Sequence, residues 1–205
     1  MDAAFTSKPK DVQRVTVYAS SSGALDDSYY DAASRLGTVL GRSGVNIVYG
    51  GGSVGLMGAM ANSALANGAH VHGVIPGFLN TVEHGHANLS KLEVVPDMRE
   101  RKHRMLAGSD AVITLPGGSG TFEEVFEAIT LKRLGDFLGP IVLVNTNRYF
   151  DRFVGFLQHS VNERFMSERH LEMWSVVEEP EQVFEAMHSA RKWSRSERAF
   201  AAVRK

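Results

Sequence analysis

Two adjacent carboxylates follow a glycine-rich turn near the middle of the chain. Residues 116–124 read Pro-Gly-Gly-Ser-Gly-Thr-Phe-Glu-Glu. Glycines let a backbone approach a ligand closely, and the unpaired N–H groups of a helix start favour an anion such as phosphate. Acids in a first helical turn can simply complement the helix dipole. A carboxylate beside a phosphate site, however, repels the phosphate unless it faces another part of the ligand. We therefore interpret Glu123 or Glu124 as aimed at a sugar or a reacting carbon.

A dense basic run, Arg99–Arg104, lies upstream of this turn. It is typical of a solvated helix face, but Arg101 and Lys102 share one broad face with Met98 and Met105 by their i, i+3, i+4 spacing. Basic groups on a partly apolar face are drawn toward the protein. An arginine there can form a forked pair with a phosphate or a carboxylate.

A second glycine run, residues 50–58, contains Gly50, Gly52 and Gly55 in the spacing G-x-G-x-x-G. That match is weak within a run of three glycines, and no acid follows the next predicted strand to hold a ribose as NAD requires. The run is interpreted either as a tight strand–helix turn or as a ligand contact. For the second interpretation, Gly51 and Gly52 are the candidates.

The histidines do not predict a metal site. His70 and His72 share one strand face, and His84 and His86 are similarly close, but neither pair has a third ligand at fixed spacing. Glu83, in the loop after the third predicted strand, is a candidate ligand contact. No Ser-His-Asp order stands out, and no lysine is placed for a pyridoxal Schiff base.

The elements that must position these residues alternate between apolar strands and helices. Strands are predicted at 14–19, 45–49, 70–75, 92–95, 111–115, 141–144 and 176–177, and helices at 29–40, 56–66, 98–106, from the 116–121 turn to 134, 149–162 and 181–190. This pattern predicts an α/β fold, a Rossmann-like open and mainly parallel sheet with helices on both faces. The loops at 20–23, 50–55 and 116–121 leave carboxyl ends of strands, where such sheets bind ligands. We expect them to converge on one crevice.

Size and composition are those of an ordinary globular protein. The chain has 205 residues, 43% of them apolar and 22% charged, a formal charge of −1 and no cysteine. The absence of cysteine excludes disulfides and thiolate catalysis, and the charge argues against nucleic-acid or membrane partners. Neither a signal peptide nor a bilayer-length apolar run is present, so we expect a cytoplasmic protein. Residues 1–190 are predicted to form a single nucleotide-binding catalytic domain, and 191–205 a basic tail that is solvated or binds an acidic partner.

Three motifs together resemble one family. Gly50–Gly58, the Glu100-Arg101-Lys102 motif after Met98, and the Pro-Gly-Gly-x-Gly-Thr-x-x-Glu motif that ends at Glu124 resemble the "lonely guy" phosphoribohydrolases, which activate cytokinins. The resemblance extends from the first strand to about residue 185. Such sequences were often labelled lysine decarboxylases, a label that this sequence does not support.

The resemblance implies hydrolysis of the N-glycosidic bond of an N6-modified adenosine 5′-monophosphate, by a homodimer without metal or organic cofactor. It implies that Arg101 and Glu124 are catalytic. It implies that the nucleotide is bound by Glu83, Lys102, Gly117, Gly118, Ser119, Gly120, Thr121, Phe122, Glu123 and Thr130. Three segments depart from the family: Arg99 replaces a histidine, Ala19–Ser22 lacks a usual cysteine, and Leu131-Lys132-Arg133 replaces a tryptophan-containing segment. These departures bear on which base is preferred.

Two other function classes stay open on the sequence. A protein of the same shape can carry a nucleotide or a molybdenum-type cofactor without consuming it, and an NAD-linked oxidoreductase is disfavoured by the missing ribose acid. The choice between AMP and a cytokinin nucleotide is open, as is the proton donor to the departing base. The apolar residues of the helix at 120–134 (Phe126, Ile129, Leu131 and Leu134) belong either to the core or to an interface.

Overall fold

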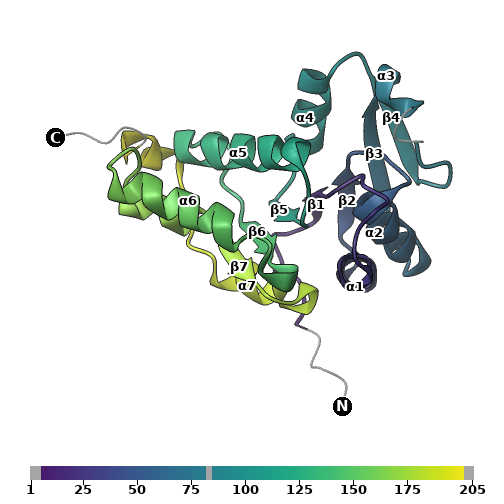
Figure 1. Cartoon of the computed structure of the whole chain (residues 1–205), viewed down its shortest axis with the longest axis horizontal. Helices are drawn as coiled ribbons and strands as arrows, with labels where there is room; N and C mark the ends of the chain where they lie inside the picture. The colour runs from purple at the N-terminus through teal and green to yellow at the C-terminus, as the bar shows by residue number, and fades with distance from the viewer. Residues whose placement is uncertain (1–5, 82–84, 201–205) are drawn as a thin grey trace.

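The structure is a computed structural model that describes residues 6–81 and 85–200. Seven strands form one sheet in the order β4-β3-β2-β1-β5-β6-β7, with every neighbouring pair parallel (Figure 1). The strands are β1 Arg14–Tyr18, β2 Asn46–Tyr49, β3 Val71–Pro76, β4 Lys91–Val95, β5 Ala111–Thr114, β6 Ile141–Val144 and β7 Ser175–Val177. The predicted α/β fold is therefore confirmed.

Apart from the short α3, which was not predicted, the helices agree with the predicted ones to within a few residues. They are α1 Asp27–Ser43, α2 Gly55–Ala66, α3 Gly77–Asn80, α4 Met98–Leu106, α5 Ser119–Leu134, α6 Asp151–Asn162 and α7 Val183–Ser189, with short 3₁₀ turns η1 Thr146–Arg148, η2 Glu168–Met173, η3 Pro180–Gln182 and η4 Arg195–Phe200. None of the helices in the described part of the chain is both long and apolar enough to cross a bilayer.

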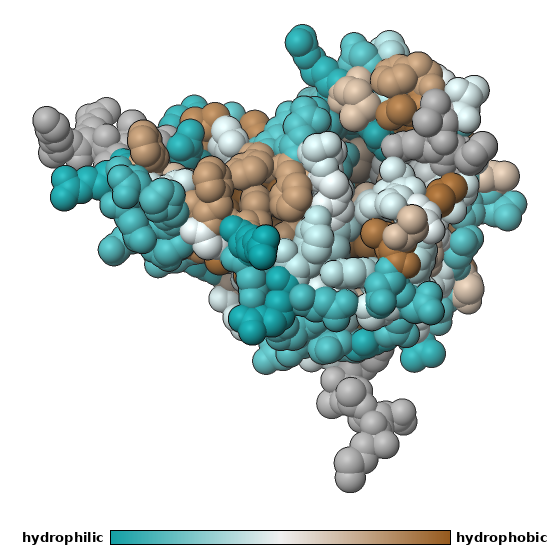
Figure 2. Space-filling model, viewed as in Figure 1, coloured by the Kyte–Doolittle hydropathy of each residue, from teal (hydrophilic) through white to brown (hydrophobic). Residues whose placement is uncertain are grey.

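The molecular surface in Figure 2 is mostly hydrophilic, with hydrophobic residues gathered over α5 and α6. Phe126 of α5 and Phe156 of α6 are among the exposed large hydrophobic residues, with exposed fractions of 36% and 59%. Of the apolar residues predicted on the helix at 120–134, Ile129 is instead buried in the core. The same helix thus supplies both the core and an exposed apolar surface.

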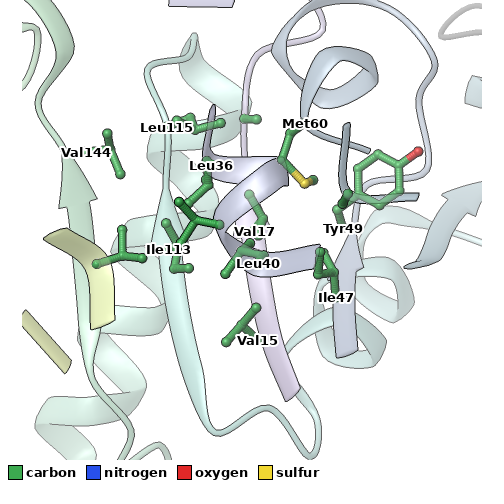
Figure 3. Packing of buried hydrophobic residues seen from close by; sticks show 14 of the residues in the cluster. Val15, Val17, Leu36, Leu40, Ile47, Tyr49, Met60, Ile113, Leu115 and Val144 are labelled. Carbon is green, nitrogen blue, oxygen red and sulfur yellow. The ribbon is translucent and has the colours of Figure 1, made fainter. Parts of the chain in front are cut away.

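The sheet separates two hydrophobic cores. In one, Val15 and Val17 of β1 and Ile113 of β5 pack against Leu36 and Leu40 of α1 (Figure 3). The other core lies between the opposite face of the sheet and α4, α5 and α6. Because successive side chains of a strand point to opposite faces, Val17 enters the first core and its neighbour Tyr18 the second.

Helix starts at the carboxyl edge of the sheet differ in a way that matters for ligand binding. Asp97 caps α4 as predicted, its carboxylate accepting from the Glu100 N–H at 2.8 Å. Helix α5 begins after Gly118 and has no side-chain cap. The first N–H groups of α5 are therefore left to other partners.

The described part of the predicted tail, residues 191–200, contacts the domain. Trp193 and Glu197 are only 6% and 7% exposed. A Glu197 carboxylate oxygen lies 2.6 Å from the Arg169 guanidinium, and Arg198 donates to the Leu134 carbonyl at the end of α5. Trp193 and Glu197 thus depart from the expected solvation, because an aromatic ring and an ion pair hold them to the domain, whereas Arg195 and Arg198 are exposed. The boundary at residue 190 stays a prediction.

Candidate functional site

A cavity of about 380 Å³ lies at the carboxyl ends of β1, β2 and β5. The described residues that line it come from the three predicted loops and from the helices beside them: residues 17–22, Gly50, Met57, Met98, Arg101, Met105, 118–121 and Glu124. The predicted convergence of the three loops is confirmed. The parallel sheet produces it, since all carboxyl ends lie along one edge.

The glycine turn before α5 leaves space where side chains would otherwise stand. At Gly117 an added Cβ would collide with the Thr121 side chain, so the turn itself requires this glycine. At Gly118 and Gly120, by contrast, an added Cβ would meet nothing within 4 Å. Neither has the positive φ that demands glycine. The protein's own packing therefore gives no reason for these two glycines, whereas a closely approaching ligand does.

Arg101 is held rigidly in this cavity although it is charged and only 5% exposed. Its Nε donates to the Val74 carbonyl at 3.1 Å, and its Nη2 donates to the Gly50 carbonyl at 2.6 Å. A Cβ at Gly50 would lie in the space of that guanidinium. A carbonyl within β3 and the carbonyl after the end of β2 thus fix the position of the cation, and these hydrogen bonds offset the cost of burying it.

Glu124 enters the same cavity from α5 and is 8% exposed, whereas the Glu123 side chain is 55% exposed. Burial raises the pKa of Tyr18, another lining residue, well above its usual value, and the charges of Glu124 and Glu127 raise it further. Of the two adjacent glutamates, Glu124 is the one that faces the interior. It shares the cavity with the Arg101 cation.

Lys102 and Glu123 pair with each other instead of lining this cavity. The Lys102 ammonium lies 2.7 Å from Glu123 and 3.1 Å from Glu127. Burial opposes the charge on Lys102, but these carboxylate partners raise its pKa overall. Lys102 and Glu127 instead line a larger groove of about 1200 Å³, which reaches residues 107–110 and 137–140 before β5 and β6.

Other predicted contacts also lie outside the described lining. Thr130 is exposed three turns along α5, and Phe122 packs among aromatic rings. The Gly51 carbonyl accepts from the His86 N–H at 2.9 Å, and Gly52 forms an isolated β-bridge with Gly85. These two glycines therefore contact the protein's own backbone and stabilise the turn. Glu83 and His84 lie outside the residues that the structure describes.

The histidine that the structure does describe in this loop, His86, is engaged by the protein itself. Its Nε2 lies 2.9 Å from the Asn62 side-chain oxygen, and its Nδ1 accepts from the Asn88 N–H. Across the described ranges, no group of three or more His, Cys, Asp or Glu residues could hold a metal ion.

Sequence reasoning missed several lining residues, namely Tyr18, Met57, Met98 and Met105. Tyr18 could have been predicted from the sequence, because it ends a strand beside a predicted site loop. Its side chain points to the opposite face of the sheet from that of the core residue Val17. Met98 and Met105 share a predicted helix face with Arg101, but apolar residues at helical spacing are typical of a core, and Met57 gives no further signal. Of the three departures from the family, only Ala19–Ser22 lies at the cavity, whereas Arg99 and Leu131 line the larger groove.

Comparisons with solved structures agree with this fold. The molybdenum cofactor carrier protein of Chlamydomonas reinhardtii is 19% identical, with a TM-score of 0.65 over 87% of this chain and 98% of the other. The X-ray structure of the protein TM1055 is 21% identical, with a TM-score of 0.69 over 86% and 99%. At these identities the similarity shows the fold alone.

Proteins of known function match this chain at higher sequence identity. The family model described as "possible lysine decarboxylase" matches residues 57–187. The cytokinin riboside 5′-monophosphate phosphoribohydrolase LOG1 of Arabidopsis thaliana is 41% identical over 155 residues, which are 76% of this chain and 73% of the relative. The enzyme of that name in Rhodococcoides fascians is 42% identical over 154 residues, or 75% and 78%. The chain therefore belongs to the LOG family, that of the cytokinin riboside 5′-monophosphate phosphoribohydrolases.

Proposed function

We propose that this protein hydrolyses the N-glycosidic bond of an adenosine 5′-monophosphate, plain or N6-modified, to the free base and ribose 5-phosphate. The observation that carries the proposal is the shared cavity of Arg101, Glu124 and the uncapped start of α5. No lysine is among the described residues that line it, so a Schiff-base decarboxylase has no matching residue there.

In this proposal the phosphate binds at the start of α5. The first N–H groups of α5 and the Thr121 hydroxyl donate hydrogen bonds to the phosphate in this proposal. The phosphate fits in the open space beside Gly118 and Gly120. A ribose held by its 5′-phosphate then lies over the next turn of the helix, which carries Glu124. Lys102 and Glu123, joined as an ion pair outside the cavity, are not assigned a contact with the phosphate.

Cleavage of the bond builds positive charge on the ribose carbon and ring oxygen. A carboxylate against that ring stabilises this charge or orients the attacking water, and we assign this role to Glu124. Arg101, fixed by the Val74 and Gly50 carbonyls, provides the positive charge that orients the carboxylate.

The proposal is tested by incubating the protein with AMP and with isopentenyl-AMP and by separating the products chromatographically. Release of free base together with ribose 5-phosphate supports hydrolysis. Binding without release points to a carrier, and a spectral change only with NADH points to an oxidoreductase.

Glu124→Gln should lower turnover at least about 100-fold while the Kd for AMP stays within about threefold, because the amide keeps the shape and loses the charge. Glu185→Gln, on an exposed position of α7, is the matched control and should behave as wild type. Turnover near the wild-type value in the Glu124 variant contradicts the role.

We also propose that the protein is a homodimer, as the family resemblance implies, and that it is cytoplasmic. The apolar surface over α5 and α6 supports an interface there, since contiguous exposed apolar residues mark association sites. Sedimentation velocity of the purified chain tests this, and a species that stays monomeric at micromolar concentration contradicts it.

A further inference from the structure

The loop between β6 and α6 reaches across to the glycine turn of the site. Tyr149 donates its hydroxyl proton to the Gly117 carbonyl at 2.6 Å. Its ring stacks on Phe122 with centroids 6.3 Å apart and planes at 14°, and meets Tyr29 and Phe150 edge-on at 6.2 and 5.3 Å. The bond therefore joins residues 32 positions apart in the sequence.

The peptide that accepts this bond has little else to orient it. It lies between Gly117 and Gly118, so no Cβ restricts rotation on either side. In a trans peptide the C=O and the N–H point in opposite directions. When Tyr149 holds the Gly117 carbonyl on its own side, the Gly118 N–H must point away from it.

That N–H has no other assignment. Gly118 lines the cavity, and within the described ranges its N–H takes part in no hydrogen bond. We propose that Tyr149 is a positioning residue that presents the Gly118 N–H to the 5′-phosphate of the bound nucleotide. The identity of the ligand rests on the function proposed above.

Hydrogen bonds to neighbouring segments hold the loop that carries Tyr149 in one conformation. Asn147 and Arg148 both have positive φ, 54° and 59°, an uncommon conformation for residues other than glycine. Such strain persists only where the surroundings over-determine the backbone. Here the Asn145 side chain accepts from the Phe150 N–H at 2.7 Å, and the Asn147 side chain donates to Ser28 of α1 at 2.8 Å.

The phenol also remains a donor at physiological pH. Burial raises the pKa of Tyr149, and the neighbouring Tyr29 raises it further. The hydroxyl is therefore protonated wherever the protein is folded near neutrality, and the hydrogen bond to Gly117 does not titrate.

The matched variants are Tyr149→Phe and Tyr29→Phe. Both keep the aromatic cluster, but only the first removes the bond to Gly117, because the Tyr29 hydroxyl has no hydrogen bond within the described ranges. Calorimetric Kd values for AMP and for ribose 5-phosphate should rise about 5- to 10-fold in Tyr149→Phe, the effect of about one lost hydrogen bond. They should stay within twofold in Tyr29→Phe.

A positioning role and a merely structural one differ in their readouts. Positioning raises KM by the same factor as Kd and leaves kcat and the melting temperature nearly unchanged. Unchanged Kd values in Tyr149→Phe, or equal losses in both variants, overturn the inference, and so does a fall in kcat together with melting temperature. If the wild type binds AMP and releases no base, the proposed hydrolysis fails, and the Kd comparison still tests Tyr149.

Discussion

At the residue scale, the candidate site depends on absent side chains as much as on charged ones. Gly50 leaves room for the Arg101 guanidinium, while Gly118 and Gly120 leave room that no atom of residues 6–81 or 85–200 fills. The charged residues then divide by burial: Arg101 and Glu124 are enclosed, and Lys102 and Glu123 neutralise each other outside the cavity. Under the proposed function, nucleotide recognition depends on the glycines and on the buried pair together.

The open space at Gly120 gives a prediction with opposite effects on stability and on binding. Gly120→Ala should leave the melting temperature unchanged or raise it, because alanine is favoured over glycine in a helix by about 1 kcal/mol. The Kd for AMP should nevertheless rise at least about 10-fold, since the methyl group enters the ligand space. Calorimetry and thermal unfolding measure the two effects.

Gly155→Ala is the control, because Gly155 lies in α6 and an added Cβ there also meets nothing within 4 Å. It should stabilise the protein to a similar degree without changing the Kd for AMP. Tight AMP binding by Gly120→Ala would show that the ligand does not approach that position.

At the element scale, the two ends of α5 differ, because its start lines the cavity and its end is buried. Near its end, Lys132 is 1% exposed, donates to the Gly139 carbonyl at 2.7 Å, and lies 6.0 Å from the centroid of the Trp193 ring. Burial lowers the pKa of Lys132 to about 8. The C-terminal segment thus covers Lys132, whose charged form is less stable in the folded protein than in water.

Replacing this cation should therefore stabilise the protein. The lowered pKa corresponds to a loss of about 3 kcal/mol in the free energy of unfolding at pH 7. Replacing the lysine removes this loss but also removes a hydrogen bond that contributes about 1 kcal/mol. Lys132→Met should raise the free energy of unfolding by about 2 kcal/mol at pH 7, measured by urea denaturation. Lys192→Met, at an exposed position of the same segment, should change it by less than about 0.5 kcal/mol.

The pH dependence follows from the same pKa. Between about pH 8 and 10.5 the unfolded chain still binds the lysine proton while the folded protein has released it. The wild type should therefore gain stability as the pH rises through this window, and Lys132→Met should not. Parallel pH profiles for the two proteins would contradict the assignment.

At the scale of the whole molecule, buried histidines make the fold sensitive to acid. His170 is 1% exposed; its Nδ1 accepts from the Ser167 N–H, so the proton on Nε2 is donated to the Phe200 carbonyl. Burial lowers the pKa of His170, the bond to Phe200 partly opposes this, and the Arg133 charge adds to it. The pKa of His86 is likewise lowered by burial. Both histidines favour a neutral folded state.

Stability should therefore fall as the pH drops below about 6.5, where the unfolded chain takes up protons that the folded protein refuses. His170→Asn should be less stable than wild type at pH 7 but should lose less stability between pH 7 and pH 5. Thermal unfolding across that range measures the difference. An equal loss in both proteins would assign the acid sensitivity to other groups.

The sequence by itself determined the architecture and the location of the site. Apolar runs such as Ile141–Val144, the Asp97 cap and the glycine turns act over a few residues, and a parallel sheet brings its loops to one edge whatever the details. The Arg101 and Glu124 motifs resembled the family that the comparisons then showed. These features were accessible because local patterning carries them.

Only the tertiary structure decided which side chains meet. That Glu124 rather than Glu123 faces the cavity, that Lys102 pairs with Glu123 across 21 residues of sequence, and that Tyr149 reaches Gly117 across 32 all depend on how separate elements pack. The buried Trp193 and the ion pair of Glu197 depart from the expectation of a solvated end for the same reason. Charge and polarity along a chain indicate what a residue can bind, whereas the partner is chosen by contacts between segments that are distant in sequence.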